Sequence, residues 1–188
     1  KCLVKINKKK RIIDFVMDNI KKYDVNNIHF ITYYKSSKVI KYVSKKYESK
    51  FNLFFYKEKK PLGTAGGLKV LYKNKNLSDN FILINSDVIS KIDLTSLISF
   101  HVKNKSIFTL VTKLVQQKLS FGTIKNIKEV LQNIQEKPTI SYFVNAGIYL
   151  ISKKLLKFIP NNSKDYKMTD LISKLKLRKI KIKIFHLY

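Results

Sequence analysis

The sequence predicts a doubly wound α/β fold, in which a mixed, mostly parallel sheet is covered by helices on both faces. Three observations predict it. Helix-like and strand-like segments alternate over residues 12–105, which implies right-handed βαβ crossovers. The strand expected at residues 81–84 is apolar on both faces, as in sheets that are covered on two sides. The 188 residues, 45% of them hydrophobic, suffice for one domain with a proper core.

The first half of the chain supplies the alternation. Apolar side chains recur at helical spacing in the expected helices, whereas the expected strands are runs rich in β-branched and aromatic residues. In order, we expect a helix through Ile12, Ile13, Val16, Met17 and Ile20, a strand over 28–34, a helix with Val39, Ile40, Val43 and Tyr47 on one face, a strand over 51–56, a helix through Leu68, Leu71 and Tyr72, and the strand over 81–84.

The pattern changes after a further helix expected over residues 93–105. Strands then follow one another without helices between them, which predicts an antiparallel extension of the core sheet. The expected strands cover residues 107–114, 121–127, 130–135 and 142–151; short helices around 153–158 and 168–175 and a final strand over 179–187 complete the chain. One mixed-sheet domain, residues 1–188, accounts for all of these elements.

The net charge of +27 raises the hypothesis of a nucleic-acid partner, because basic surfaces attract phosphate backbones. The composition argues against it. Only Arg11 and Arg178 are arginines among the 39 basic residues, and the other 37 are lysines scattered along the chain. A dedicated nucleic-acid surface usually draws on the planar arginine side chain, so nucleic-acid binding is the weaker hypothesis.

The sequence also indicates the compartment. No apolar run approaches the roughly 18 to 20 residues of a membrane span, and the first residues show no signal-peptide pattern. Cys2 is the only cysteine, which excludes an internal disulfide and a cysteine-rich zinc site. We therefore expect a cytoplasmic protein without membrane contact. Because the chain starts at Lys1 rather than Met and ends in the apolar run 180–188, we expect it to be cut at both ends.

Three of the five glycines lie between residues 62 and 67, directly before an apolar helical pattern. Free backbone N–H groups at such a helix start could hold a nucleotide. Alternatively, Gly63 and Thr64 could act only as helix caps. The stretch is not a P-loop, because no Gly-Lys-Ser/Thr sequence closes it.

The apolar strand over 81–84 runs directly into Asn85, Ser86 and Asp87. Ligands of open α/β sheets gather at the carboxyl ends of strands, so Asp87 is the first candidate for a metal ligand. The alternative is that Asp87 caps a turn. Two further motifs also have structural interpretations, since proline can end the strand before residues 136–138 and residues 145–147 can form a β-bulge.

Five motifs occur in the order that a known family shows. They are residues 61–66, 85–87, 121–122, 136–138 and 145–147. Together they resemble the sugar-1-phosphate nucleotidyltransferases, also called nucleotide-sugar pyrophosphorylases, over nearly the whole chain. The resemblance implies a Rossmann-like sheet with an antiparallel sugar-binding extension. Residues 57–66, 142–149 and 166–171 are most similar to the guanylyltransferase branch, which includes mannose-1-phosphate and glucosamine-1-phosphate enzymes.

The resemblance also implies roles for individual residues. The implied catalytic residues are Lys1, Asp87 and Lys137. The nucleotide would be bound by Leu62, Gly63, Thr64 and Ala65. The sugar phosphate would be bound by Gly122, Glu136, Lys137 and Asn145. Asp87 would hold Mg²⁺, although Ser86 stands where the family usually has glycine. The family's glycine-rich loop with its arginine, and its second metal-binding aspartate, are expected outside residues 1–188. This segment alone is therefore expected to be inactive.

The implied reaction joins a nucleoside triphosphate, with GTP preferred, to a hexose- or amino-hexose-1-phosphate and releases pyrophosphate. It would supply precursors for polysaccharide or glycan synthesis, in a possible homo-oligomer with a possible attached regulatory domain. Positioning and charge neutralisation carry such transfers, so the lack of a His or Ser dyad is no objection. Two alternatives remain open: a non-catalytic regulatory homologue that binds nucleotide sugars, and a lysine-rich nucleic-acid binder.

Overall fold

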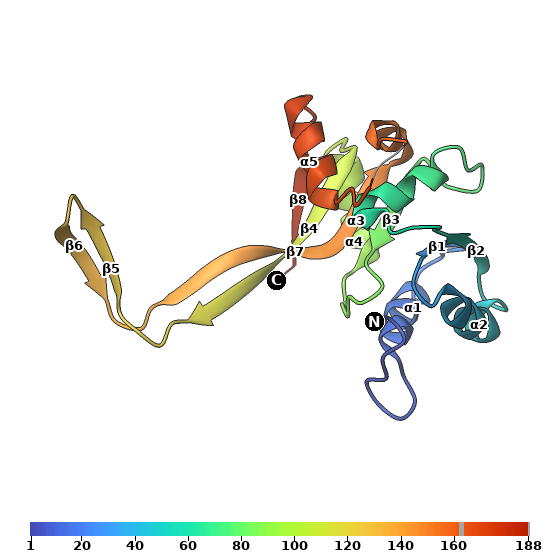
Figure 1. The fold of residues 1–188 in the computed structure, drawn as a ribbon, viewed down its shortest axis with the longest axis horizontal. Helices are drawn as coiled ribbons and strands as arrows, with labels where there is room; N and C mark the ends of the chain where they lie inside the picture. The colour runs from blue at the N-terminus through green and yellow to red at the C-terminus, as the bar shows by residue number, and fades with distance from the viewer. Residues whose placement is uncertain (162–163, 188) are drawn as a thin grey trace.

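The structure, a computed structural model, describes residues 1–161 and 164–187, so Tyr188 of the C-terminal run lies outside the described residues. Helices and strands follow one another as predicted (Figure 1). The elements are α1 (Ile12–Ile20), β1 (Asn27–Thr32), α2 (Ser36–Tyr47), β2 (Asn52–Lys57), α3 (Gly63–Gly66), the 3₁₀ helix η1 (Gly67–Leu71), β3 (Asn80–Ile84), α4 (Leu94–Lys103), β4 (Phe108–Lys118), β5 (Thr123–Ile127), β6 (Val130–Gln135), β7 (Thr139–Ser152), the 3₁₀ helix η2 (Lys153–Phe158), α5 (Met168–Leu177) and β8 (Lys183–Leu187). None of the helices in the described ranges is long and apolar enough to cross a bilayer.

The strands form a mixed arrangement. β1 and β2 pair in parallel across helix α2, which makes a βαβ unit. A second sheet has the strand order β3-β7-β4-β8, in which β7 runs antiparallel to both of its neighbours and β8 runs parallel to β4. The mixed sheet and the antiparallel extension are thus confirmed. Fewer neighbouring strands are parallel than predicted, because the long strand β7 lies between β3 and β4 and runs in the opposite direction to both.

Helices cover both faces of both sheets, which confirms the doubly wound arrangement. On β1 and β2, one face packs against α1 and α2, and the opposite face, with Ile31 and Tyr56, packs against the cluster formed by α3, η1, η2 and α5. On the second sheet, Phe108 and Tyr149 join that same cluster, whereas Val111 packs on the side of α4. Side chains along each strand point alternately to the two faces of the sheet, and each face is therefore packed against its own layer of helices.

Several predicted boundaries differ from the structure. Strand β4 runs to Lys118 rather than to residue 114, and β7 begins at Thr139 rather than at residue 142. The helix expected through Leu68, Leu71 and Tyr72 is divided into one α-helical turn, α3, and the 3₁₀ helix η1. The last strand begins at Lys183 rather than at residue 179, because Lys179 has a left-handed φ of 56° and the N–H of Ile180 donates to the carbonyl of Leu175. Residues 178–180 thus close helix α5 with a C-terminal capping turn.

An arm projects far from the helical body in Figure 1. It consists of the distal halves of β4 and β7, paired up to Lys118 and Thr139, and of the β5–β6 hairpin beyond them. All six residues of β6 and four of the five in β5 are exposed. The arm is the antiparallel extension that the sequence predicted, but it leaves the body instead of packing against it.

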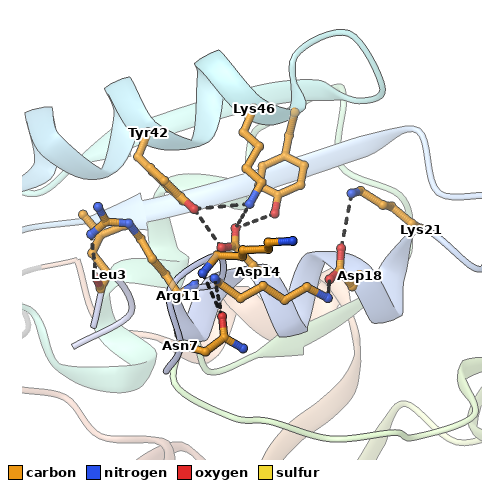
Figure 2. A network of polar contacts seen from close by, with 11 residues as sticks. Leu3, Asn7, Arg11, Asp14, Asp18, Lys21, Tyr42 and Lys46 are labelled. Carbon is orange, nitrogen blue, oxygen red and sulfur yellow. Dashed lines mark hydrogen bonds and ion pairs between the residues drawn. The ribbon is translucent and has the colours of Figure 1, made fainter. Parts of the chain in front are cut away.

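Helices α1 and α2 are joined by a buried carboxylate, Asp14 (Figure 2). It accepts hydrogen bonds from the hydroxyls of Tyr47 at 2.6 Å and Tyr42 at 2.7 Å, and from the N–H of Arg11 at 2.7 Å. Lys46 Nζ lies 2.9 Å from the same carboxylate. Asp14 therefore caps the start of α1 and anchors α2 against it in one network.

This network makes stability depend on acid pH. Burial alone would raise the pKa of Asp14, but hydrogen bonds from Arg11, Tyr47, Tyr42 and Lys46 outweigh it and lower the pKa from 3.8 to about 2. Because the folded pKa is depressed, this stabilisation is fully present above about pH 4 and is lost as the pH falls through 2. We expect the free energy of unfolding to fall by about 2 kcal/mol across this pH window. Urea unfolding at one pH above the window and one pH below it measures the difference. Asp14→Asn should remove this component, so an unchanged pH dependence in that variant would contradict it.

Candidate functional site

Strand β3 ends at Ile84 and places Asn85, Ser86 and Asp87 at its carboxyl end. The chain turns there through the backbone, since the N–H of Val88 donates to the carbonyl of Asn85 at 3.1 Å. Asp87 is exposed, and within residues 1–161 and 164–187 its carboxylate makes no hydrogen bond or ion pair. The side chain is therefore available to a ligand, and it does not cap the turn.

The middle of β7 lies beside this turn. The N–H of Asn85 donates to the carbonyl of Gly147 at 2.9 Å, and a Cβ at Gly147 would lie 2.7 Å from Asn85 Nδ2. Gly147 also has a φ of 71°, so this position requires glycine on two grounds. Two of the predicted motifs, residues 85–87 and 145–147, are thus brought together.

The predicted sugar contact Asn145 lies in the region where the register between β4 and β7 shifts. Its Oδ1 accepts from the N–H of Gly147 at 2.9 Å, and its Nδ2 donates to the hydroxyl of Tyr149 at 2.7 Å. The bulge interpretation is confirmed, and both ends of the amide are used within the chain. The remaining acceptor and donor capacity of the amide is what a sugar hydroxyl could use.

The glycine stretch packs against the chain that precedes α5. Gly63 has a φ of 83°, and a Cβ there would lie 2.5 Å from the carbonyl oxygen of Tyr166. That carbonyl accepts from the N–H groups of both Ala65 and Gly66 at 3.0 Å, and Thr64 Oγ1 accepts from the N–H of Met168. The prediction of free N–H groups at this helix start is therefore wrong for Ala65 and Gly66, because the chain's own carbonyl occupies them.

A cavity of about 280 Å³ lies next to this stretch, at the carboxyl ends of the parallel strands β1 and β2. Its lining includes Leu62, Gly66 and Gly67, and four lysines surround it: Lys57, Lys59, Lys60 and Lys69. Within the described part of the chain, none of these lysines forms an ion pair with a carboxylate. Their positive potential would attract a polyanion such as a triphosphate.

Glu58 is the acidic residue among these lysines, and the sequence interpretation did not single it out. Burial raises the pKa of its carboxyl group, while a hydrogen bond from the backbone of Leu62 opposes the rise. The side chain lies against Gly67 in the wall of the cavity. One signal could have found it: a single glutamate flanked by lysines directly after an apolar strand and before the glycine stretch.

Lys1 belongs to an N-terminal turn that α1 holds in place. Its carbonyl accepts from the N–H of Val4 at 2.9 Å, and Arg11 Nη1 donates to the carbonyl of Leu3 at 2.8 Å (Figure 2). Leu3 packs on the same core cluster as Ile84, the last residue of β3. The structure thus places the N-terminal turn on a core that the end of β3 also contacts.

Gly122, Glu136 and Lys137 lie on the arm, on either side of the β5–β6 hairpin. A Cβ at Gly122 would lie 3.1 Å from Glu136 Oε2, and Lys137 Nζ lies 3.9 Å from Glu136 Oε1, so these three residues are together. In this conformation the hairpin is remote from β3 (Figure 1). The structure therefore groups the predicted sugar-phosphate residues but separates them from Asp87.

A divalent cation would find one free carboxylate at Asp87. The described residues contain no group of three or more His, Cys, Asp or Glu side chains that could hold a metal ion. This rules out a ready-made protein cage within those residues. The single carboxylate of Asp87 fits Mg²⁺, which is commonly bound by one or two carboxylates together with substrate phosphates.

The fold, the turn after β3 and the glycine stretch define a class of nucleotide-handling proteins. A sequence model of the nucleotidyl transferase family matches residues 1–183, and the chain belongs to this family. The resemblance inferred from the five motifs is thereby confirmed.

Individual relatives of this chain include proteins named for mannose-1-phosphate guanyltransferase. A protein of Sulfolobus acidocaldarius, provisionally named mannose-1-phosphate guanyltransferase, is 31% identical over 152 residues, which are 80% of this chain and 42% of that protein. The mannose-1-phosphate guanyltransferase of Yarrowia lipolytica is 35% identical over 122 residues, 61% of this chain and 34% of that enzyme. The chain thus spans less than half the length of these relatives.

Among solved structures, HddC from Yersinia pseudotuberculosis complexed with GMP-PN has a similar fold. The TM-score is 0.73 at 22% identity, and the match covers 98% of this chain and 80% of that one. At this identity the likeness supports the fold, including the mixed sheet with helices on both faces.

Proposed function

We propose that this chain is the main part of the catalytic domain of a sugar-1-phosphate nucleotidyltransferase, which joins GTP to a hexose- or amino-hexose-1-phosphate. The products are a nucleotide sugar and pyrophosphate. The observation that carries the proposal is the free carboxylate of Asp87 at the carboxyl end of strand β3, in a chain that belongs to the nucleotidyl transferase family. The relatives named for mannose-1-phosphate guanyltransferase support the choice of substrates.

The reaction forms a bond between a phosphate oxygen of the sugar phosphate and the α-phosphorus of the triphosphate, and the bond from the α-phosphorus to the pyrophosphate oxygen breaks. The sugar phosphate is already ionised at neutral pH, so no general base is needed. Bound Mg²⁺ would neutralise charge on the phosphates, with Asp87 as its protein ligand. Lys1 and Lys137 would orient the phosphates by point-charge contacts.

The nucleoside is proposed to occupy the cavity beside the glycine stretch, with its phosphates directed toward Asp87. Leu62, Gly63, Thr64 and Ala65 would then form the wall on which the nucleoside rests. Glu58 supports GTP, because a carboxylate accepts two hydrogen bonds from the adjacent N1–H and N2–H groups of guanine, and no other common base offers two adjacent donors. The complex of HddC with GMP-PN is consistent with this choice.

The sugar phosphate is proposed to lie between the end of β3 and β7, where Asn145 is beside the turn that carries Asp87. Gly122, Glu136 and Lys137 would contact it after the arm bends toward β3. We also propose that the enzyme is cytoplasmic and serves the synthesis of polysaccharide or glycan precursors. The proposal is tested by incubating the full-length protein with GTP, Mg²⁺ and mannose-1-phosphate or glucosamine-1-phosphate and identifying the product by mass spectrometry. A nucleotide sugar supports it, and unchanged substrates from folded protein contradict it.

Glu58→Gln tests the assignment of the base. Glutamine replaces one carboxylate oxygen of Glu58 with an NH₂ group. One of the two N–H donors of guanine would then face another donor instead of an acceptor. We expect kcat/KM for GTP to fall by roughly 10- to 100-fold, with a smaller change for ATP, CTP and UTP. Glu48→Gln, an exposed change directly after α2, is the matched control and should leave kcat/KM unchanged. A Glu58→Gln enzyme with undiminished preference for GTP would remove Glu58 from the base site.

A further inference from the structure

The root of the arm, where β4 lies between β7 and β8, presents the ring of Phe143 to solvent (Figure 1). Phe143 is 50% exposed, and it lies two residues before Asn145 in β7. A single exposed apolar side chain is ordinary on a protein surface. Phe143 differs from such a side chain because neighbouring side chains fix its ring, and because Asn145, the proposed sugar contact, lies on the same face of the sheet.

A polar pair holds the ring of Phe143. The ring of His186 in β8 packs against it, with 4.2 Å between the two ring centroids. Nδ1 of His186 lies 2.8 Å from Oγ1 of Thr112, and Thr112 is only 6% exposed. Thr112 belongs to β4, the strand between β7 and β8. The ring of Phe143 is therefore held by contacts that cross three strands, which restricts its rotamers before any ligand binds.

The strand register places Phe143 and Asn145 on one face of the sheet. Thr112 is the direct partner of Asn145 in β7 and of His186 in β8, and directly paired residues project from the same face. Phe143 is two residues from Asn145, so it projects with Asn145, and its contact with His186 agrees with this. The amide of Asn145 and the ring of Phe143 are thus neighbours on one surface.

The distance along β7 suits a hexose. Ile84, the last residue of β3, pairs with Ile148, and the turn that carries Asp87 follows directly. A sugar phosphate with its phosphate at this turn and its ring at Asn145 therefore extends along β7 toward the arm. Two residues of a strand span about 6.7 Å, which is comparable with the width of a pyranose ring. The edge of the sugar opposite C1 thus reaches Phe143.

We infer that Phe143 is a specificity-determining contact for the sugar, and that His186 and Thr112 are positioning residues that hold its ring. This role rests on the proposed function, because it requires Asn145 to bind the sugar of a sugar phosphate or nucleotide sugar. The C–H groups at the edge opposite C1 pack on the phenyl ring, which removes apolar surface of both from water. A phenyl ring cannot hydrogen-bond to a carboxylate at C6, which loses water there without gaining a partner. Neutral hexose-1-phosphates, and those with an amino group at C2, are therefore selected over uronic acid 1-phosphates.

Steady-state kinetics of the full-length protein with GTP and Mg²⁺ test this role. Phe143→Leu should raise the KM for mannose-1-phosphate by roughly 10-fold and leave kcat and the KM for GTP within about twofold, since the contact is made equally before and during transfer. Phe143→Tyr keeps the ring and should keep the wild-type KM. The matched control is Tyr142→Leu, because Tyr142 is 42% exposed but points to the opposite face, where its hydroxyl donates to Gln117 at 3.2 Å. His186→Ala releases the ring of Phe143 and should raise the KM for mannose-1-phosphate about threefold with kcat unchanged. The wild type should use mannuronic acid 1-phosphate roughly 10-fold less efficiently than mannose-1-phosphate.

Saturation-transfer NMR tests the contact without turnover. The probe is GDP-mannose, the product proposed for GTP and mannose-1-phosphate, which an enzyme and a regulatory homologue would both bind. When the aromatic protons of the protein are saturated, the mannose protons on C3 to C5 should receive more saturation than the proton on C1 in the wild type and in Tyr142→Leu, but not in Phe143→Leu. This pattern in a protein that releases no pyrophosphate would contradict the proposed reaction and still support the role of Phe143. That role would be overturned by GDP-mannose that does not bind, by equal saturation of these protons in the wild type and Phe143→Leu, by an unchanged sugar KM in Phe143→Leu, or by equal use of the uronic acid.

Discussion

We expect turnover to fall by roughly 10²- to 10³-fold when Asp87 is replaced by asparagine, because the change removes the charged side chain that is proposed to hold Mg²⁺ against the phosphates. Asp87 is exposed and has no hydrogen bond or ion pair within the described residues, so no structural contact is lost with the charge. The free energy of unfolding should therefore stay within about 0.5 kcal/mol of the wild type. The effect should appear in kcat and should be larger at low Mg²⁺ concentration.

The matched control is Asp79→Asn. Asp79 is also exposed, but it directly precedes β3 and thus lies at the amino end of the strand whose carboxyl end carries Asp87. The control removes the same charge from the opposite end of the sheet, and we expect kcat to change less than about twofold. Equal losses in both variants would show that overall charge matters rather than a site at Asp87. Wild-type kcat in Asp87→Asn would remove Asp87 from the site.

The second expected result concerns stability. Replacing Asp14 with alanine should lower the free energy of unfolding by about 3 kcal/mol or more, because it leaves one buried donor and two half-buried donors without their acceptor. The affected donors are the hydroxyls of Tyr42 and Tyr47 and the N–H of Arg11, and Lys46 loses its counter-ion. Urea unfolding followed by circular dichroism measures the difference.

Asp18→Ala is the control for this variant, on the same helix. Asp18 lies 2.7 Å from Lys10 Nζ and 3.3 Å from Lys21 Nζ, but it is partly exposed, and such surface pairs contribute less than about 1 kcal/mol. If Asp14→Ala costs no more than Asp18→Ala, the Asp14 network does not hold α1 and α2 together. A loss confined to Asp14→Ala would confirm that burial, rather than the number of ion pairs, sets the effect.

Most of the fold was readable from the sequence because it depends on local periodicity. The helix through Ile12 and Ile20 follows from apolar side chains at helical spacing, and the strand of residues 81–84 follows from a short apolar run; both are present. Strand direction is not a local property. The sequence could not indicate that β7 lies between β3 and β4, because pairing depends on contacts between residues far apart in the chain.

The candidate site also has features that depend on local sequence and features that depend on contacts between distant residues. The turn that carries Asp87 and the irregularity at Gly147 could be predicted because a polar stretch after a buried strand and a glycine within an apolar strand are local signals. The role of Gly63 could not, since the chain segment that approaches it contains Tyr166, about a hundred residues away. Glu58 was missed because one glutamate among lysines gains significance only when folding places it in the wall of a cavity.

The decisive measurement is pyrophosphate release by the full-length protein with Mg²⁺, across a grid of the four nucleoside triphosphates and several hexose- and amino-hexose-1-phosphates. We expect release only when GTP and one sugar phosphate are present together, and its rate should fall in the Asp87→Asn protein. No release across the grid, from folded protein that still binds GTP or a nucleotide sugar, would contradict the proposed reaction and indicate a regulatory homologue without turnover.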